Sequence, residues 1–197
     1  MHSSPFFLWM ILAFLLGSIP FGYLLVYLKG KGDIRNFGSG NIGATNVARA
    51  GGSLLGILTL GCDLSKGVLA VLLVKTWGHP DWVFWATLSC VLGHIFTPWL
   101  KFKGGKGVAT LCGALVIASS NLLLAALFVF FVFFFITRIV SLSSIAAAFS
   151  LPLFTAYLFD SLGTDFWLIV LLSLLIIVKH RSNIDRLLKK EEPTFHF

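Results

Sequence analysis

The sequence has little charge for its length. Of its 197 residues only 12% are Asp, Glu, Lys or Arg, while 57% are hydrophobic and 15% are aromatic. The mean hydropathy is +0.93. So few charged side chains cannot cover a soluble globule of this size, which excludes an ordinary soluble domain. The composition predicts a polytopic integral membrane protein.

Cysteine is scarce as well. The three cysteines, Cys62, Cys90 and Cys112, lie within apolar runs, are odd in number and show no C-x-x-C spacing. Neither a disulfide framework nor a zinc site is indicated. The Walker A spacing G-x-x-x-x-G-K-[ST] is also missing, so ATP or GTP hydrolysis is not supported. We expect no metal and no cofactor.

Long apolar runs dominate the rest of the chain. About 20 apolar residues in a helix cross the ~30 Å hydrocarbon layer. We therefore predict an all-α protein of about seven transmembrane helices that forms a single domain over residues 1–197. The expected spans are Phe6–Leu28, Ser53–Val74, Trp82–Leu100, Val108–Ser119, Leu122–Ile136, Leu142–Phe159 and Phe166–Val178.

Two of these spans carry signs of a break. Gly17-Ser18-Ile19-Pro20 lies inside the first run and predicts a kink that frees backbone groups in mid-membrane. Ser119-Ser120-Asn121 reads as a tight turn between the fourth and fifth spans. The alternative is one long tilted helix over Gly107–Ile136, which would leave six spans.

Positive charge is distributed asymmetrically between the predicted loops. Thirteen of the 15 Lys and Arg residues lie in loops of one parity or in the C-terminal tail. The positive-inside rule then places the N-terminus outside and the C-terminus in the cytoplasm. The formal charge of +7 is largely a topology signal. We therefore expect no nucleic-acid partner.

Two polar, glycine-rich loops are predicted at the cytoplasmic face. Gly38–Arg49, the first polar loop, offers many backbone N–H groups and can fold into a nest that holds phosphate. Lys101–Gly107, the Lys/Gly loop, alternates ammonium groups with glycines and leads into a helix N-terminus, which favours anions. The alternatives are a flexible connection for the first and a snorkelling basic loop for the second.

Polar residues near the C-terminal spans add to this face. Arg138–Ser144 supplies one cation and three hydroxyls, including Ser141 and Ser143, although serines at a helix start are more often caps. His180 and Asn183 share a helical face where the last span ends. We expect these side chains to join the two glycine-rich loops.

Three titratable residues fall inside the predicted spans. Asp63 and Lys66 are three residues apart in the second span, and His94 lies in the third. Such groups are costly in the membrane unless they are paired, so they should face the bundle interior. We expect Asp63 and Lys66 to satisfy each other in a mainly structural role.

Three segments resemble, in order, the three motifs of the bacterial acyl-phosphate:glycerol-3-phosphate acyltransferases, the PlsY family. They are Ser39–Arg49, Phe102–Thr110 and His180–Ile184, and Asp63–Gly67 and Gly93-His94 are similar as well. The resemblance spans nearly the whole chain. One departure is Asp185, where the family more often carries a basic residue.

The resemblance implies an activity, its partners and a location. A fatty acyl group would pass from acyl-phosphate to the 1-hydroxyl of glycerol 3-phosphate, giving lysophosphatidate and phosphate. This is the first acylation step of phospholipid synthesis. The partners would be the two substrates and membrane lipids. The enzyme would lie in the bacterial cytoplasmic (inner) membrane, with its active site on the cytoplasmic face.

The site residues follow from the motifs and their chemistry. Lys106 and Arg49 would hold phosphate and neutralise its charge, together with the N–H groups of the glycines in the Lys/Gly loop. His180 could accept the proton, although the substrate's own phosphate could do so instead. We predict Lys106, Arg49, His180 and Ser39 as catalytic. We predict Asn41, Gly43, Thr45, Asn46, Gly104, Gly105, Gly107, Ser141, Ser143 and Asn183 as substrate-binding.

Another class of protein has to be weighed against the enzyme. A transporter of a phosphate-bearing organic anion would commonly show an internal repeat and a polar site near the membrane midplane. We see no convincing repeat, and the polar loops gather at one predicted face. A non-catalytic scaffold would leave the phosphate-type loops unexplained. Which loop binds the donor and which the acceptor stays open.

Overall fold

The chain forms two compact helical units. The computed structural model describes residues 5–159 and 162–195, and the secondary structure of these residues is helical. The first unit is Met1–Ala118 and the second is Ser119–Phe197.

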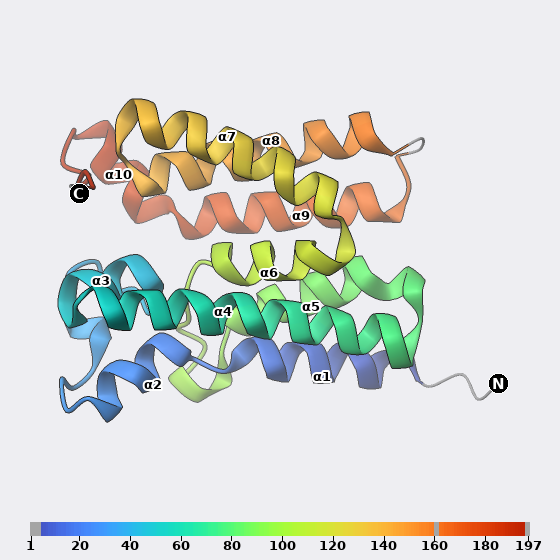
Figure 1. Ribbon diagram of the computed structural model, residues 1–197, viewed down its shortest axis with the longest axis horizontal. Helices are drawn as coiled ribbons and strands as arrows, with labels where there is room; N and C mark the ends of the chain where they lie inside the picture. Colours follow the sequence, from blue (N-terminus) through green and yellow to red (C-terminus); the bar gives the residue numbers. More distant parts are fainter. Residues whose placement is uncertain (1–4, 160–161, 196–197) are drawn as a thin grey trace. The chain divides into compact units, whose positions relative to one another are not determined.

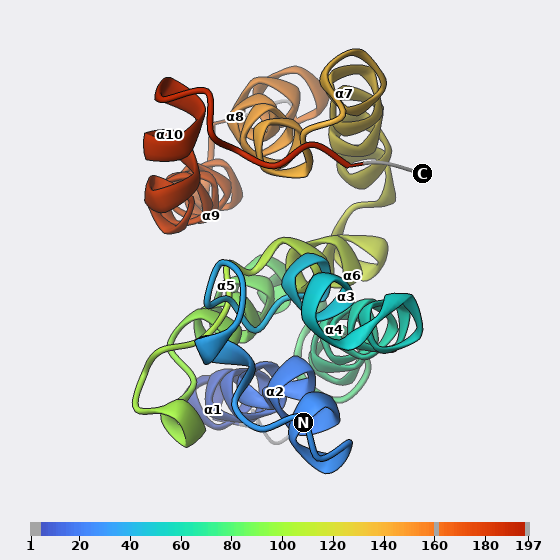
Figure 2. The same cartoon turned by 90° about the vertical axis from the view of Figure 1, so that its left-hand side faces the viewer.

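The first unit is built around the long helix α4. This helix packs against α1, α5 and α6, and α1 packs along α5 (Figures 1 and 2). The helices are α1 Phe6–Ser18, α2 Phe21–Leu28, α3 Ala44–Gly51, α4 Ser53–Leu73, α5 Val83–Ile95 and α6 Val108–Ala118. Short 3₁₀ turns cover Ile34–Asn36, Pro80–Trp82 and Pro98–Leu100, and a π-helical turn covers Val74–Gly78.

The second unit has four helices with α8 in the middle. Helix α8 contacts α7, α9 and α10, and α10 also contacts α9 (Figure 2). Helices α9 and α10 meet at a bend of 56°. The bounds are α7 Ser120–Thr137, α8 Val140–Leu158, α9 Thr164–Lys179 and α10 Arg181–Leu188.

The predicted kink in the first span is confirmed as a full break between α1 and α2. Pro20 lacks an N–H and cannot continue the helix, so nearby carbonyls lose their helical partners. The Ser18 carbonyl accepts a 2.6 Å hydrogen bond from Thr97 Oγ1, and the Ile19 carbonyl accepts one of 2.8 Å from Lys66 Nζ. Side chains from other elements thus satisfy backbone groups that water would otherwise bind.

Glycines allow two pairs of helices in the first unit to approach closely. A Cβ on any of these glycines would clash with a backbone carbonyl of the opposite helix. Small residues of this kind let backbones approach closely where lipid gives no hydrophobic driving force between helices. Each crossing uses one glycine from either helix: Gly17 and Gly93 between α1 and α5, and Gly67 and Gly113 between α4 and α6.

The predicted apolar spans all correspond to helices, although not all reach spanning length. Five helical segments of the described chain are long and apolar enough to cross a membrane, and the bent pair α9–α10 passes the same test as one unit. Helix α6 is a shorter apolar helix of 11 residues. The count of seven crossings, the orientation and the single-domain assignment stay predictions.

Two segments next to the predicted spans can be compared with the observed helices. Gly107–Ile136 forms two helices, because Ser119 interrupts the run and its Oγ accepts the Leu122 N–H of α7 at 3.4 Å. The connection Lys29–Gly52, expected to be a loop, contains α3. Arg49 therefore lies in the last turn of α3 rather than in a loop.

The crossing of α4 and α6 predicts a position-specific effect of alanine. Gly67→Ala should destabilise the protein by about 1–3 kcal/mol, because the new methyl group meets the Thr110 carbonyl of α6 and forces the helices apart. Gly61→Ala on the same helix is the matched control, since a Cβ at Gly61 meets nothing within 4 Å. Thermal unfolding in detergent measures both, and equal melting temperatures would contradict the close crossing.

Candidate active site

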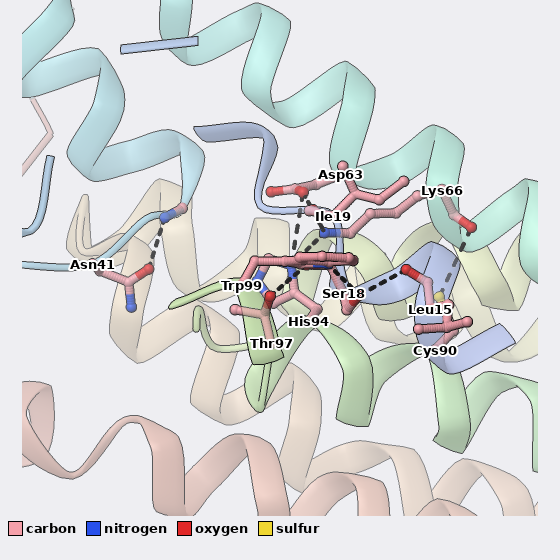
Figure 3. A network of polar contacts seen from close by, with 11 residues as sticks. Leu15, Ser18, Ile19, Asn41, Asp63, Lys66, Cys90, His94, Thr97 and Trp99 are labelled. Atoms are coloured by element: carbon pink, nitrogen blue, oxygen red, sulfur yellow. Dashed lines mark hydrogen bonds and ion pairs between the residues drawn. The ribbon is translucent and has the colours of Figure 1, made fainter. Parts of the chain in front are cut away.

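The first polar loop is organised by the buried side chain of Asn46. Its Oδ1 accepts the Ser39 N–H at 2.9 Å, and its Nδ2 donates to the carbonyls of Phe37 (3.0 Å) and Asn41 (2.8 Å). Asn41 in turn accepts the Gly43 N–H at 2.7 Å (Figure 3). The predicted residues Ser39, Asn41, Gly43 and Asn46 therefore lie together. Asn46 shapes the loop from within.

The remaining predicted residues of this loop lie on α3. Thr45 is half-buried in the first turn, whose N-cap is Gly43, and Arg49 is exposed in the last turn. The exposed guanidinium of Arg49 is open to a ligand. Ser39 is exposed as well, so its hydroxyl is also open to a ligand.

A second arginine, Arg35, is committed to a structural pair. Its Nη2 lies 2.6 Å from Asp33 Oδ2, and its own backbone N–H donates to Asp33 Oδ1 at 2.9 Å. Its guanidinium also lies over the ring of Tyr23. The hydrogen bonds from Arg35 hold the pKa of Asp33 below its usual value. The pair fixes the backbone just before the first polar loop. Arg49, by contrast, is exposed at the end of that loop.

The two glycine-rich loops share an apolar floor. Ile34, Ile42 and Val47 from the first polar loop and its flanks form one buried cluster with Leu100. Leu100 ends the 3₁₀ turn that leads directly into Lys101–Gly107. The shared core therefore brings the first polar loop close to the start of the Lys/Gly loop.

The Lys/Gly loop folds back onto the end of α5. Gly104 N–H donates to the Ile95 carbonyl and Gly105 N–H to the His94 carbonyl, both at 3.1 Å. These two N–H groups, expected to donate to phosphate, are used inside the protein, and that part of the hypothesis is corrected. Their glycine identity has a steric cause, because a Cβ at either position would clash with α5.

The end of this loop keeps its predicted form. Gly107 has φ +89°, a left-handed conformation that favours glycine, and its carbonyl accepts the Leu111 N–H of α6 at 2.8 Å. Lys106 is half-buried immediately before this turn, at the start of α6. The structure thus presents one lysine at a helix N-terminus, where the dipole favours an anion.

Asp63, Lys66 and His94 form a buried network (Figure 3), and the His94 ring lies against Gly105 of the Lys/Gly loop. Lys66 Nζ lies 2.8 Å from Asp63 Oδ1 and 2.8 Å from His94 Nδ1. The predicted pairing of Asp63 with Lys66 and their burial are confirmed. His94 is a third member that the spacing on one helix could not show.

In the second unit, a tail carboxylate draws predicted residues together. Glu192 Oε1 accepts from Ser141 Oγ and from Asn183 Nδ2, each at 2.7 Å, and Oε2 accepts from Arg186 Nε at 2.7 Å. Burial raises the pKa of Glu192, but these hydrogen bonds and the charge of Arg186 outweigh it and hold the pKa below its usual value. Glu192 and Arg186 were missed as partners because they lie in a basic tail without a motif.

The other predicted residues of the second unit differ in what they offer. Ser143 Oγ donates to the Ile139 carbonyl of its own helix start at 2.9 Å, so it does not join the Glu192 cluster. His180 is buried at the junction of α9 and α10, with Nδ1 2.8 Å from the Ile176 carbonyl. Because a carbonyl only accepts, Nδ1 carries a proton, and a neutral ring then has its lone pair on Nε2.

Comparisons with known proteins point in one direction. A family model described as "Glycerol-3-phosphate acyltransferase" matches residues 7–190. A protein of that name from Pelagibacter ubique (strain HTCC1062) is 46% identical over 182 residues, covering 91% of this chain and 92% of its own. Its counterpart from Caulobacter vibrioides (strain NA1000 / CB15N) is 48% identical, covering 91% and 83%.

Solved structures agree. The crystal structure of PlsY (YgiH), an integral membrane glycerol 3-phosphate acyltransferase, in its glycerol 3-phosphate form, superposes with a TM-score of 0.89 at 41% identity, covering 97% of this chain and 96% of that one. Its lysophosphatidic acid form gives 0.85 at 39%. The expected class, an all-helical integral membrane protein, is thereby confirmed.

The Glu192 cluster predicts a pH-dependent contribution to stability. Folding lowers the pKa of Glu192, so its ionised carboxylate stabilises the folded protein. This stabilisation is fully present above the unfolded-state pKa of about 4.3 and is lost as the pH falls through the lower pKa of the folded state. Glu192→Gln should cost about 1–3 kcal/mol at pH 7. The difference in melting temperature between parent and variant should shrink below about pH 4.

The neighbouring Glu191 supplies the control for this experiment. Glu191 is exposed, so Glu191→Gln should leave the melting temperature close to that of the parent at either pH. A Glu192→Gln variant as stable as the parent at pH 7 would show that the tail carboxylate does not hold α8 and α10 together.

Proposed function

Because the chain belongs to the glycerol-3-phosphate acyltransferase family, we propose that it transfers a fatty acyl group from acyl-phosphate to the 1-hydroxyl of glycerol 3-phosphate. The products are 1-acyl-glycerol 3-phosphate (lysophosphatidate) and phosphate, and the step is the first acylation of phospholipid synthesis. The observation that carries the proposal is the match over nearly the whole chain to an integral membrane enzyme solved in its glycerol 3-phosphate form.

The reaction needs anion binding more than covalent help from the protein. The hydroxyl oxygen of glycerol 3-phosphate attacks the acyl carbon, the bond from that carbon to the phosphate oxygen breaks, and phosphate leaves with the electron pair. Acyl-phosphate is a mixed anhydride and already activated. The proposed mechanism therefore asks the site to orient two phosphate-bearing substrates and to neutralise the charge that develops on the leaving group.

The first unit supplies the cations in this proposal. Lys106 at the start of α6 would hold phosphate with help from the helix dipole. Arg49, exposed on α3, would clamp a phosphate, and a guanidinium can do so with two parallel hydrogen bonds. Ser39 and Thr45 would add hydroxyl donors. The apolar floor shared by the two loops supports their acting together.

The second unit supplies residues for the glycerol moiety in this proposal. His180 and Asn183 would orient glycerol 3-phosphate. The tautomer with Nδ1–H bound to Ile176 makes Nε2 the ring atom that could take the hydroxyl proton. A phosphate oxygen of the substrate is the other acceptor. Ser141 and Ser143 would stand behind these residues at the start of α8.

The proposed location is the bacterial inner membrane, with the site on its cytoplasmic face. The bias of Lys and Arg toward one set of loops supports this orientation. Glycerol 3-phosphate is a charged solute that does not cross a bilayer unaided. A site on the cytoplasmic face would meet it there, while the acyl chain stays in the lipid.

The donor can be tested directly with purified protein. We expect phosphate release and lysophosphatidate formation from acyl-phosphate and glycerol 3-phosphate, and neither product when either substrate is omitted. Acyl-coenzyme A offered in place of acyl-phosphate tests the donor. Faster transfer from acyl-coenzyme A would reject the acyl-phosphate assignment. Uptake of labelled glycerol 3-phosphate into proteoliposomes without acyl transfer would favour a transporter.

Replacement of His180 separates the two proton acceptors. Either assignment places the ring at the glycerol hydroxyl, so His180→Ala should lower kcat/KM by about 100-fold or more. A loss in kcat assigns the proton to His180, whereas a rise in the KM for glycerol 3-phosphate alone assigns it to substrate phosphate. His79→Ala, an exposed histidine before α5, is the control expected to keep parent kinetics. Unchanged kcat/KM in His180→Ala would remove His180 from the site.

A further inference from the structure

Three buried titratable side chains of the first unit lie outside the proposed set of catalytic and substrate-binding residues. Asp63 and Lys66 stand one helical turn apart on α4, and His94 lies in the last turn of α5 (Figure 3). The Asp63 and Lys66 side chains are each 2% exposed and the His94 side chain is 4% exposed. Buried ionisable side chains are costly in a membrane, so these three indicate a specific role.

The Lys66 ammonium is the centre of this network. Its nitrogen lies 2.8 Å from each of three acceptors: Asp63 Oδ1, His94 Nδ1 and the Ile19 carbonyl. An ammonium has three N–H donors and no lone pair: Lys66 Nζ makes hydrogen bonds to His94 Nδ1 and the Ile19 carbonyl and an ion pair with Asp63 Oδ1. His94 Nδ1 must accept, which places the proton of the neutral ring on Nε2.

Stability alone is a poor reason for such a network. Removing two charges from water is costly, and well-packed apolar side chains of similar size often stabilise a buried site as well or better. Inside a membrane the cost of charged groups is high unless they are paired. The distinct property of this network is that it fixes one relative placement of α4, α5 and the break between α1 and α2.

The network ends at the Lys/Gly loop. The His94 carbonyl accepts the Gly105 N–H, and the imidazole stands against the Gly105 Cα so closely that a Cβ there would clash with Nε2. Gly104 binds the next carbonyl, that of Ile95. The ring and the end of α5 therefore form the wall on which the loop lies, immediately before Lys106.

A second set of bonds ties the same loop to the helix break. Thr97 Oγ1 donates to the Ser18 carbonyl at 2.6 Å, and Trp99 Nε1 donates to Ser18 Oγ at 2.9 Å. The Thr97 carbonyl accepts the Phe102 N–H at 2.9 Å inside the loop. The break, the end of α5 and the Lys/Gly loop thus form one hydrogen-bonded assembly, in which Lys66 is bonded to the break at Ile19 and to His94 of α5.

We propose that Asp63, Lys66 and His94 are positioning residues for the reaction. Asp63 holds the Lys66 ammonium, Lys66 holds the His94 ring, and the ring sets the height of the Gly104–Gly107 backbone and with it the Lys106 ammonium. The inference rests on the proposed function. None of the three residues touches substrate in this proposal; they determine how well a phosphate group meets Lys106.

Three variants of the full-length protein test the proposal. His94→Phe keeps an aromatic ring but removes the Nδ1 acceptor. His94→Asn keeps an acceptor, its Oδ1, near the place of Nδ1. The pair Asp63→Asn with Lys66→Met removes both charges and leaves neither one buried alone. Each purified protein is assayed for kcat, for the KM of both phosphate-bearing substrates and for its melting temperature.

The expected result is a split between binding and chemistry. His94→Phe and the paired variant should raise the KM of one phosphate-bearing substrate by about 10- to 100-fold, since a displacement of about 1 Å has effects of this size. Their kcat and melting temperature should change far less. His94→Asn should return that KM toward the parent value, because its Oδ1 can again accept from Lys66.

Thr59→Val is the matched control. Thr59 is fully buried on the same helix, and its Oγ1 donates to the Leu55 carbonyl of α4 at 2.8 Å. Valine keeps the shape and removes only this bond within the helix. The KM of both substrates should stay at the parent value, so a rise here would assign the effect to general loosening of α4 and overturn the proposal.

Other outcomes overturn the proposal in distinguishable ways. Folded variants whose two KM values are unchanged would overturn this inference but leave the proposed function in place. Variants whose fall in kcat and rise in KM are proportional to their fall in melting temperature would do the same. Failure of every variant to fold, His94→Asn included, would show that the network holds the fold. An inactive parent protein would instead remove the proposed function, and this inference with it.

Discussion

The first unit depends on one constraint: a backbone carbonyl freed within an apolar medium must find a donor. Pro20 interrupts the first span. The Ser18 carbonyl accepts from Thr97 Oγ1, and the Ile19 carbonyl accepts from Lys66 Nζ as well as from the Phe21 N–H at 3.1 Å. Lys66 in turn is held by Asp63 and His94. The break in the helix and the buried charges are therefore linked through Lys66.

Glycine serves packing and chemistry in different parts of the same unit. Where α1 meets α5 and α4 meets α6, it lets two backbones touch. In the Lys/Gly loop, Gly104 and Gly105 do the same between a loop and the end of α5. A loop whose N–H groups were expected to hold phosphate is thus partly packed tightly against α5. In the proposed mechanism the charge offered to phosphate is carried by Lys106, Arg49 and the start of α6.

Much of the fold could be predicted from the sequence, because the hydropathy of a segment indicates whether it lies in lipid or in water. The apolar segments, the break at Pro20, the separation at Ser119 and the pairing of Asp63 with Lys66 all follow from local patterns, and the family resemblance is confirmed. The short helix α3 was missed because the segment around it is rich in glycine and asparagine, which favour loops. Local spacing also could not show which N–H groups of the Lys/Gly loop were already engaged.

Contacts between segments far apart in the sequence could not be predicted either. The contacts of Glu192 have a practical consequence. Its carboxylate meets Ser141, 51 residues earlier in the chain, and the nearby Phe195 N–H donates to the Arg138 carbonyl at 2.7 Å. A chain trimmed at Lys190 would keep helices α1 to α10 yet leave Ser141, Asn183 and Arg186 without their shared acceptor. For this protein, the choice of where to end a recombinant chain or attach a purification tag decides whether these three side chains keep their shared acceptor.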